Sequence, residues 1–256
     1  MKNRVLAIDL GNTTISYALF QKSRIIVYEY TRNSDIPALI KSIRKRGVKQ
    51  PFDVILTSVV PKKALKLKKA LKRSFKEIKI WEVGKNVHPK VKMRYKRSNL
   101  GSDRLVNVYG ALQRYRLPIL VIDYGTAITF DFIDKKGIFS GGLIVPGIET
   151  SWAALQERAA LLPKLPKLKL VNKLTPTETR SAMYSGVLNG FGALSEGLVS
   201  RYKKKYGRKM TVLATGGASV LIAPFISDIS EFDIVDPLHT LKSLNLIFQK
   251  EILKNA

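Results

Sequence analysis

Residues 7–13 read AIDLGNT and residues 121–127 read VIDYGTA, so a short apolar strand runs into Asp-x-Gly twice in one chain. A single strand that ends in Asp and Gly indicates an ordinary turn, because both residues favour turn conformations. Two copies, each followed by a second β-rich stretch, indicate a duplicated unit. Strands bunched at the start of each copy, with helices after them, predict an α/β fold in two similar halves.

Periodicity gives the expected elements of both halves. Strands are expected over residues 4–10, 13–20, 24–30, 53–60, 118–125, 128–134, 137–145 and 211–215. Helices are expected over residues 35–47, 62–79, 100–115, 150–161 and 179–206, between the Gly-Gly turn and residue 225, and from about residue 237. We place the boundary after residue 116, which gives halves 1–116 and 117–256 packed around a cleft. Asp131 and Asp134 are expected in turns, and Gly186 and Gly190 at a close helix contact.

The composition excludes several classes of site. Without cysteine and with only two histidines among 256 residues, the chain offers no disulfide, thiolate nucleophile or zinc–cysteine site, and proton transfer falls to a carboxylate. Its apolar runs fall far short of the roughly 18 residues that span a bilayer, and the start MKNRVLAIDLGN resembles no signal peptide. We therefore expect a cytoplasmic protein without membrane insertion.

The charge is unusually positive, with 45 Lys and Arg against 19 Asp and Glu and a formal net charge of +26. Its lysines alternate with a regular core stripe, which is typical of solvated helical faces. Such a surface should attract polyanions unspecifically, because the sequence carries no base-reading motif.

The two Asp-x-Gly turns offer the parts of a phosphate site. Glycine lets the backbone approach a bulky anion, and Asn12, Thr13, Thr14 and Ser16 add neutral donors in the first turn. A carboxylate such as Asp9 faces a nucleotide through Mg²⁺ and its waters. Asp123, Gly125 and Thr126 repeat these parts, and TGG at 215–217 is placed to close on a nucleotide. Neither GxxxxGK[ST] nor a GxGxxG turn after a strand is present, which disfavours P-loop and Rossmann folds.

Further motifs narrow this pattern to one family. They are TSVVP at 57–61, GSDR at 101–104, DYGTAITFD at 123–131, GGLIVPGI at 141–148 and Thr179 seven residues before Gly186. Together they resemble type III pantothenate kinases of the actin/Hsp70/sugar-kinase superfamily. The resemblance implies two ribonuclease H-like halves with a cleft between them. It also implies ATP-dependent phosphorylation of pantothenate, the first step of coenzyme A synthesis, by a homodimer that needs Mg²⁺ and either K⁺ or NH₄⁺.

The resemblance also implies a role for individual residues. Asp103 would be the general base, Thr126 would bind a phosphate of ATP, Asp123 would bind the monovalent cation, and Asp9 would hold Mg²⁺ through water. The first phosphate loop would comprise Asp9, Leu10, Gly11, Asn12, Thr13, Thr14, Ile15 and Ser16. The pantothenate site would comprise Tyr95, Gly101, Ser102, Asp103, Arg104 and Thr179.

The sequence departs from the family pattern at two places. The family has Asn-Pro after the tyrosine and one more residue before Gly-x-Asp-Arg, whereas this chain reads YKRSNLGSDR from Tyr95. This chain also has Ser243, in a C-terminal helix, where the family tends to have glycine. The first departure affects the expected pantothenate pocket.

Physical chemistry supports GSDR independently. Phosphorylation of an alcohol takes its proton late, so an aspartate is a sufficient base, and an adjacent arginine keeps that carboxylate ionised and can bind an acidic substrate. The alternative is that Asp103 only caps a helix starting near Arg104. For the whole protein, the alternatives are a kinase-like nucleic-acid-binding or regulatory accessory protein and a kinase for another acidic or sugar substrate.

Overall fold

The computed structural model describes residues 4–31, 35–48, 52–226, 228 and 231–255, and its contacts divide the chain into two units. The first unit comprises residues 1–114 and 238–256, and the second comprises residues 115–237. The division therefore falls close to the expected boundary after residue 116, but it returns the C-terminal segment to the first unit.

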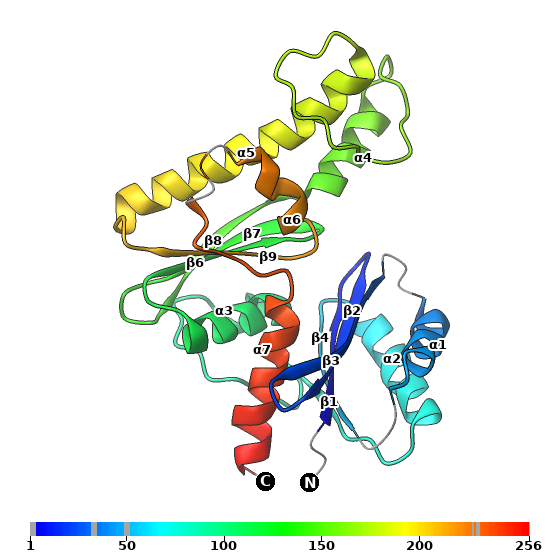
Figure 1. Cartoon of the computed structure of the whole chain (residues 1–256). Coiled ribbons are helices and arrows are strands. Elements are labelled where there is room, and N and C mark those ends of the chain that lie inside the picture. Colours follow the sequence, from blue (N-terminus) through cyan, green and yellow to red (C-terminus); the bar gives the residue numbers. More distant parts are fainter. Residues whose placement is uncertain (1–3, 32–34, 49–51, 227, 229–230, 256) are drawn as a thin grey trace. The chain divides into compact units, whose positions relative to one another are not determined.

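The first unit is built on a five-stranded sheet in the order β3-β2-β1-β4-β5 (Figure 1). The first three strands form an antiparallel meander, while β4 pairs parallel with β1, and β5 parallel with β4. The strands are β1 (Arg4–Leu10), β2 (Ile15–Gln21), β3 (Arg24–Thr31), β4 (Asp53–Ser58) and β5 (Ile80–Glu82).

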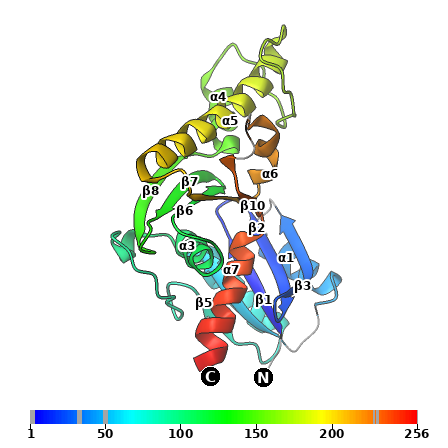
Figure 2. The same ribbon diagram turned by 60° about the vertical axis from the view of Figure 1, so that its left-hand side comes forward.

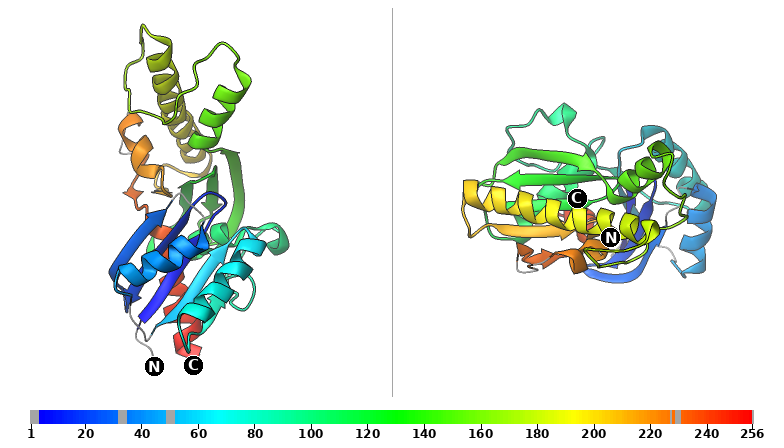
Figure 3. Two further views of the ribbon diagram at one scale, coloured as in Figure 1. Left: turned by 90° about the vertical axis from the view of Figure 1, so that its right-hand side faces the viewer. Right: turned by 90° about the horizontal axis from the view of Figure 1, so that it is seen from above.

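Helices cover both faces of this sheet. They are α1 (Ile36–Lys45), α2 (Pro61–Ser74), α3 (Ser102–Arg114) and α7 (His239–Ile247), with the short turns η1 (Arg97–Asn99), η4 (Phe248–Ile252) and η5 (Leu253–Asn255). Leu39 of α1 and Leu67 of α2 pack against Leu6 and Ile8 of β1, so α1 and α2 cover one face (Figure 3). Residues of α7 contact β1, β2 and β4, while α7 lies beside α3 (Figure 2).

Helix α2 ends earlier than the periodicity predicts, at Ser74 rather than near residue 79. Phe75 is extended, with φ of −135°, and its ring packs edge-on against Phe52 at 5.2 Å. Phe75 and Ile78 are buried as their spacing suggested. The chain must leave the helix there because it enters β5 at Ile80, a short strand that the sequence pattern did not indicate.

Helices α3 and α7 cross closely through two small residues. A Cβ atom on Gly110 would lie 1.8 Å from Oγ of Ser243, so only glycine fits there. The Ser243 hydroxyl donates to the His239 carbonyl at 2.6 Å and accepts from the Arg114 guanidinium at 2.6 Å. The departure at Ser243 therefore affects α3 as well as the C-terminal helix, and glycine on the facing helix accommodates it.

The second unit repeats the topology of the first, with a sheet in the order β10-β9-β6-β7-β8. Its first three strands are antiparallel neighbours and β9 pairs parallel with β6, as β4 does with β1. The strands are β6 (Ile119–Tyr124), β7 (Ala127–Ile133), β8 (Phe139–Pro146), β9 (Thr211–Thr215) and β10 (Ile234–Val235). The duplication expected from the two Asp-x-Gly strands is confirmed at the level of strand order and direction.

Helix α5 (Thr179–Tyr206) has the bounds expected from the sequence. Its buried Leu188 and Val199 pack with the sheet residues Leu120 and Phe130, so α5 covers one face of the second sheet (Figure 3). The other helical segments of this unit are α4 (Ile148–Arg158), α6 (Ser219–Ile222) and η2 (Ala223–Phe225). Within the described residues, no helix is both long and apolar enough to span a membrane.

Two expectations in the second unit are wrong. Asp131 lies inside β7 and is fully buried, whereas Asp134 does lie in a turn, where it accepts from the backbone N–H of Lys136 at 2.9 Å. A Cβ atom on Gly186 or Gly190 would meet no atom within 4 Å, and the close approach occurs instead at Gly192, where it would lie 2.0 Å from the Phe225 carbonyl oxygen. The four-residue spacing of Gly186 and Gly190 therefore did not identify Gly192 as the glycine that another segment contacts closely.

Candidate active site

The first Asp-x-Gly segment forms a tight hairpin turn between β1 and β2. The Gly11 N–H donates to the Thr14 carbonyl at 2.9 Å, and a Cβ atom on Gly11 would lie 3.3 Å from that oxygen. Asn12 and Thr13 are exposed, so the turn presents its polar groups to solvent. Asp9 precedes the turn and is paired in register with Ser16 of β2. Within the predicted phosphate loop, only residues 11–14 form the turn, while Leu10 ends β1, Ile15 begins β2 and both of these side chains are fully buried.

A lysine that the sequence analysis did not single out contacts this turn. Nζ of Lys63, in the first turn of α2, donates to the Asn12 carbonyl at 2.8 Å. The start of α2 lies near the turn because β4, which leads into it, runs parallel to β1 and both strands end at the same edge of the sheet. A basic residue directly after the TSVVP segment was the available signal, and it was obscured by the many other lysines of α2.

Asp103 lies in the first turn of α3, which begins at Ser102. Its Oδ1 accepts a hydrogen bond from the Arg104 backbone N–H at 2.8 Å. Burial raises the pKa of the Asp103 carboxyl above its ordinary value, although this hydrogen bond and the Arg104 charge oppose the shift. A Cβ atom on Gly101 would lie 2.5 Å from that oxygen, so glycine at this position leaves room for the carboxylate.

Hydroxyl groups fix the position of the GSDR segment against β4. Oγ1 of Thr57, which is fully buried, donates to Oγ of Ser102 at 2.8 Å, and Ser102 donates to the Ser58 carbonyl at 3.0 Å. A donor chain of this kind holds the start of α3 in one orientation. The TSVVP motif therefore positions the residues around Asp103.

Arg104 and Tyr95 come together despite the shortened segment between them. The Arg104 guanidinium carbon lies 5.5 Å from the centroid of the Tyr95 ring, within the range of a cation–π contact. Arg104 is 7% exposed and has further interactions. The segment between the two residues forms η1, and Arg97 donates to the Pro89 carbonyl at 2.6 Å. The missing residue and proline thus leave the tyrosine beside the arginine.

The second Asp-x-Gly segment forms a similar turn in the second unit. The Gly125 N–H donates to the Ala127 carbonyl at 3.2 Å, and Thr126 is exposed. The Thr126 carbonyl accepts from the Gly147 N–H at 3.0 Å and from the Thr150 hydroxyl at 2.7 Å. A Cβ atom on Gly147 would lie 2.3 Å from the Gly125 oxygen, so glycine at the start of α4 allows this contact.

The TGG segment packs directly against Asp123. Gly216 has a φ of +87°, and a Cβ atom there would lie 2.4 Å from Oδ1 of Asp123 and 2.7 Å from the Tyr124 carbonyl oxygen. The Tyr124 carbonyl also accepts from the Ala218 N–H at 3.2 Å. A carboxylate and a carbonyl oxygen therefore meet beside Gly216, and oxygen ligands of this kind suit a hard cation.

Thr179 lies at the start of a helix and not in one of the Asp-x-Gly turns. It is the first residue of α5, it is exposed, and within the described part of the chain its side chain makes no hydrogen bond. The described residues also contain no group of three or more His, Asp or Glu side chains that could hold a metal ion. Single carboxylates such as Asp9 fit a divalent ion that takes most of its ligands from phosphate and water.

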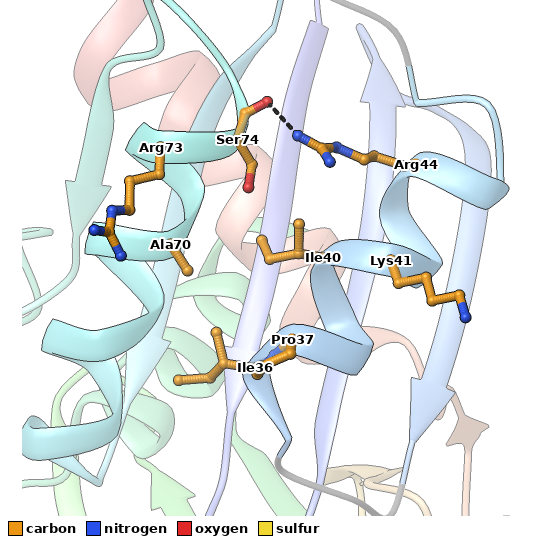
Figure 4. A pocket seen from close by; sticks show the side chains of 8 residues that line it. All are labelled: Ile36, Pro37, Ile40, Lys41, Arg44, Ala70, Arg73 and Ser74. Carbon is orange, nitrogen blue, oxygen red and sulfur yellow. Dashed lines mark hydrogen bonds between the residues drawn. The ribbon is translucent and has the colours of Figure 1, made fainter.

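A hollow of about 410 Å³ lies between α1 and α2, away from all of these residues (Figure 4). Ile36, Ile40 and Ala70 lie along it, and Arg44 reaches across one end to donate to the Ser74 carbonyl at 3.1 Å. None of the predicted site residues lines it. The candidate site is therefore defined by its turns and side chains rather than by this hollow.

Sequence comparisons agree with the motifs. A family model described as type III pantothenate kinase matches residues 5–201. The type III pantothenate kinase of Caulobacter vibrioides is 38% identical over 240 residues, which cover 90% of this chain and 92% of that protein. The corresponding enzyme of Bacillus cytotoxicus is 31% identical, with 97% of each chain covered.

Solved structures agree with the fold. A Baf family transcriptional activator from Campylobacter jejuni matches with a TM-score of 0.61 and 20% identity, covering 98% of this chain and 100% of that one. A structure described as a 2-dehydro-3-deoxygalactonokinase from Sinorhizobium meliloti matches with a TM-score of 0.55 and 10% identity, covering 97% and 99%. At these identities the likeness concerns the fold alone.

Proposed function

The chain belongs to the type III pantothenate kinase family, and we propose on that premise that it transfers the γ-phosphate of ATP to the hydroxyl group of pantothenate. The product would be 4′-phosphopantothenate, the first intermediate of coenzyme A synthesis. The observation that carries the proposal is the arrangement at the start of α3, where a carboxylate with a raised pKa stands next to an arginine and a tyrosine.

Asp103 acts as the general base in this proposal. Phosphoryl transfer to an alcohol passes through a loose transition state, in which the hydroxyl proton leaves late. The base therefore needs to orient the hydroxyl and accept its proton, and burial that raises the pKa of Asp103 makes the carboxylate a better acceptor near neutral pH. Gly101 provides the space for that carboxylate.

Arg104 and Tyr95 bind pantothenate in this proposal, together with Gly101, Ser102 and Thr179. Pantothenate carries a carboxylate, and a guanidinium binds a carboxylate through paired N–H donors. The Tyr95 ring restrains that guanidinium from one side. The contact supports the assignment of Tyr95 despite the shortened segment that follows it.

The two hairpin turns bind the phosphates of ATP in this proposal. The segment Asp9–Ser16 supplies backbone and hydroxyl donors, and Thr126 supplies a further hydroxyl. Lys63 holds the first turn through the Asn12 carbonyl and places a positive charge beside it. Asp9 would hold Mg²⁺ through water molecules, and the bound ion would neutralise charge on the transferred phosphoryl group.

Asp123 holds a monovalent cation, K⁺ or NH₄⁺, in this proposal. Its carboxylate and the Tyr124 carbonyl both approach Gly216, which supports an oxygen-lined site. The positive φ of Gly216 keeps the TGG segment close to these oxygens. The role of the chain is to present the oxygens in a fixed geometry.

We also propose that the enzyme acts in the cytoplasm as a homodimer. Large apolar side chains on the second unit support self-association: Leu161 is 98% exposed, Leu174 is 85% exposed and Leu170 is 65% exposed. The net charge of +26 supports unspecific binding of polyanions. Sedimentation over a range of protein concentrations tests the dimer, and the salt dependence of nucleic-acid binding tests the second proposal.

The accessory-protein alternative receives no support, because the Baf-family likeness at 20% identity concerns the fold alone. The experiment that separates the remaining alternatives measures ATP consumption by the purified protein with a panel of acceptor alcohols. Pantothenate should give the highest kcat/KM. Equal or faster turnover with a sugar or another hydroxy acid would assign the site to a different kinase.

A further inference from the structure

A second hollow of the first unit lies between α2 and the segment that leads into β5. Its volume is about 620 Å³, which is within the range of small-molecule sites. It is lined by Leu65, Lys68, Lys69, Lys72, Ile78, Lys79, Ile80, Trp81 and Asn86, which we call the lysine groove. None of these residues belongs to the proposed kinase site.

Positive charge is concentrated in the lysine groove. Lys68 forms an ion pair with the buried Glu82, with 2.5 Å between Nζ and Oε2, so its charge is partly balanced. Lys69, Lys72 and Lys79 are exposed, and none of the described residues that line the groove carries a carboxylate. Like charges that line one hollow repel one another, and an anion bound between them offsets that repulsion. The groove is therefore matched to a multiply charged anion.

The spacing of the lysines favours a compact anion over a long strand. Lys68, Lys69 and Lys72 are separated by one, three and four positions on α2, so their side chains leave the helix within about one turn, or roughly 6 Å. Lys79, which follows α2 in the chain, lines the same groove. Two or three linked phosphates span such a cluster, whereas a nucleic-acid backbone would need charges spread along a longer path.

The remaining lining indicates a second part of the ligand. Leu65, Ile78, Ile80 and Trp81 give the groove an apolar side. The Trp81 indole nitrogen is buried and has no hydrogen-bond acceptor within the described residues. That nitrogen is closed to solvent, so a ligand in the groove would meet the partly exposed side chain of Trp81 instead. An indole side chain also provides a surface for a ring.

We propose that the lysine groove binds an organic di- or triphosphate, in which two or three linked phosphates contact Lys69, Lys72 and Lys79 and an apolar or ring-shaped group lies near Trp81. Lysine suits this role because its ammonium group contacts phosphate as a mobile point charge. The site is separate from the one that would phosphorylate pantothenate, so it binds its ligand whether or not the proposed reaction takes place.

Trp81 allows the proposal to be tested directly, because the chain has only two tryptophans. In Trp152→Phe protein, the remaining indole fluorescence reports on the groove. The probes are UTP, inorganic tripolyphosphate and orthophosphate, added without Mg²⁺ at constant ionic strength. Fluorescence should change with saturation for UTP and tripolyphosphate, with UTP binding more tightly, and orthophosphate should have little effect. If Trp152→Phe does not fold, the two indole ¹⁵N–¹H signals of the unsubstituted protein replace the fluorescence.

Two triple variants with the same change in net charge localise the binding. Lys69→Gln/Lys72→Gln/Lys79→Gln should weaken UTP and tripolyphosphate binding about tenfold or more, because each substitution removes a positive charge near the bound phosphates. The control, Lys41→Gln/Lys45→Gln/Lys209→Gln, removes three exposed lysines outside the groove and should change binding by less than about threefold, since distant charges are screened. Both variants should phosphorylate pantothenate at the rate of the unsubstituted protein.

Three results would overturn the proposal. Equal weakening in both triple variants would show that the anions respond only to net charge. An unchanged Trp81 signal during saturation would place the binding elsewhere. Tighter binding of a single-stranded oligonucleotide than of UTP, lost in the groove variant, would identify a nucleic-acid surface instead. A loss of kinase activity alone would bear on the proposed function and leave this site intact.

Discussion

Replacing Asp103 by Asn tests the proposed base with little change in shape. The amide oxygen of Asn can still accept the hydrogen bond that Oδ1 receives from the Arg104 N–H at 2.8 Å. What the variant lacks is an acceptor for the proton of the substrate hydroxyl. We expect kcat to fall by about 10² to 10⁴, equivalent to about 3–5 kcal/mol of transition-state stabilisation. The affinity for ATP should change little, because both hairpin turns are untouched.

The Asp103→Asn variant should be at least as stable as the unsubstituted protein at neutral pH, although its kcat falls. Burial raises the folded-state pKa of Asp103 above its unfolded value of about 4. The folded chain then binds the carboxyl proton more tightly than the unfolded chain does. The protonated carboxyl therefore contributes to folding stability at low pH, and this contribution is lost as pH rises through the folded-state pKa. Asn carries no charge and escapes that loss. Asp103→Asn should therefore melt at or above the temperature of the unsubstituted protein at pH 7–8, and the advantage should vanish below about pH 4.

The assay combines kcat, ATP affinity and melting temperature at pH 5 and pH 8. Glu157→Gln is the matched control, since it also replaces a carboxylate by an amide and Glu157 is exposed in α4. It should leave all three quantities nearly unchanged. An unchanged kcat in Asp103→Asn, or a lower melting temperature at pH 8 with normal kcat, would contradict the role of Asp103 as a base.

Four further results are expected. Gly101→Ala should lower kcat by about 10²-fold with modest loss of stability, because its Cβ would meet Oδ1 of Asp103 at 2.5 Å and displace the carboxylate; steady-state kinetics at saturating ATP check this, and unchanged kcat would contradict it. Gly216→Ala should cost about 1–3 kcal/mol of folding free energy, measured by urea unfolding, because of the positive φ and the contact with Asp123; no loss would mean that the TGG segment can move away. Replacing K⁺ by Na⁺ at constant ionic strength should lower activity, and full activity without K⁺ and NH₄⁺ would refute the cation role of Asp123. The kcat/KM for pantothenate should fall as pH decreases through the raised pKa of Asp103, and a profile flat down to about pH 4 would contradict that shift.

Much of the fold followed from local patterns. The two strands ending in Asp-x-Gly predicted the repeat, and both sheets have the same strand order and directions. The three-residue β5 and the two-residue β10 were missed, because strands this short have no recognisable alternation. The placement of α7 in the first unit was also missed. That placement depends on contacts with β1 and β2, which lie more than 200 residues earlier in the chain.

Parts of the site could be predicted where the contacting residues lie close together in the sequence. The Gly11–Thr14 turn and the carboxylate beside Gly101 each lie within one short segment. The contact between Gly216 and Asp123 does not, because the two residues are far apart in the sequence. Lys63 and Gly147 could not be assigned in the same way, since their partners are distant in sequence. Asp131 was misread because an aspartate near the end of a strand pattern usually marks a turn, whereas tertiary packing buries this one.

Phosphorylation of pantothenate by this chain can be followed directly through its product. The most direct measurement is ³¹P NMR of a reaction of the purified protein with ATP, Mg²⁺, K⁺ and pantothenate, with Asp103→Asn as the parallel sample. We expect a phosphate-monoester signal that matches authentic 4′-phosphopantothenate and grows as the γ-phosphate signal of ATP declines, and we expect the variant to form that product at least about a hundredfold more slowly. A folded, ATP-binding protein that leaves pantothenate unmodified, or that phosphorylates another alcohol in its place, would contradict the account.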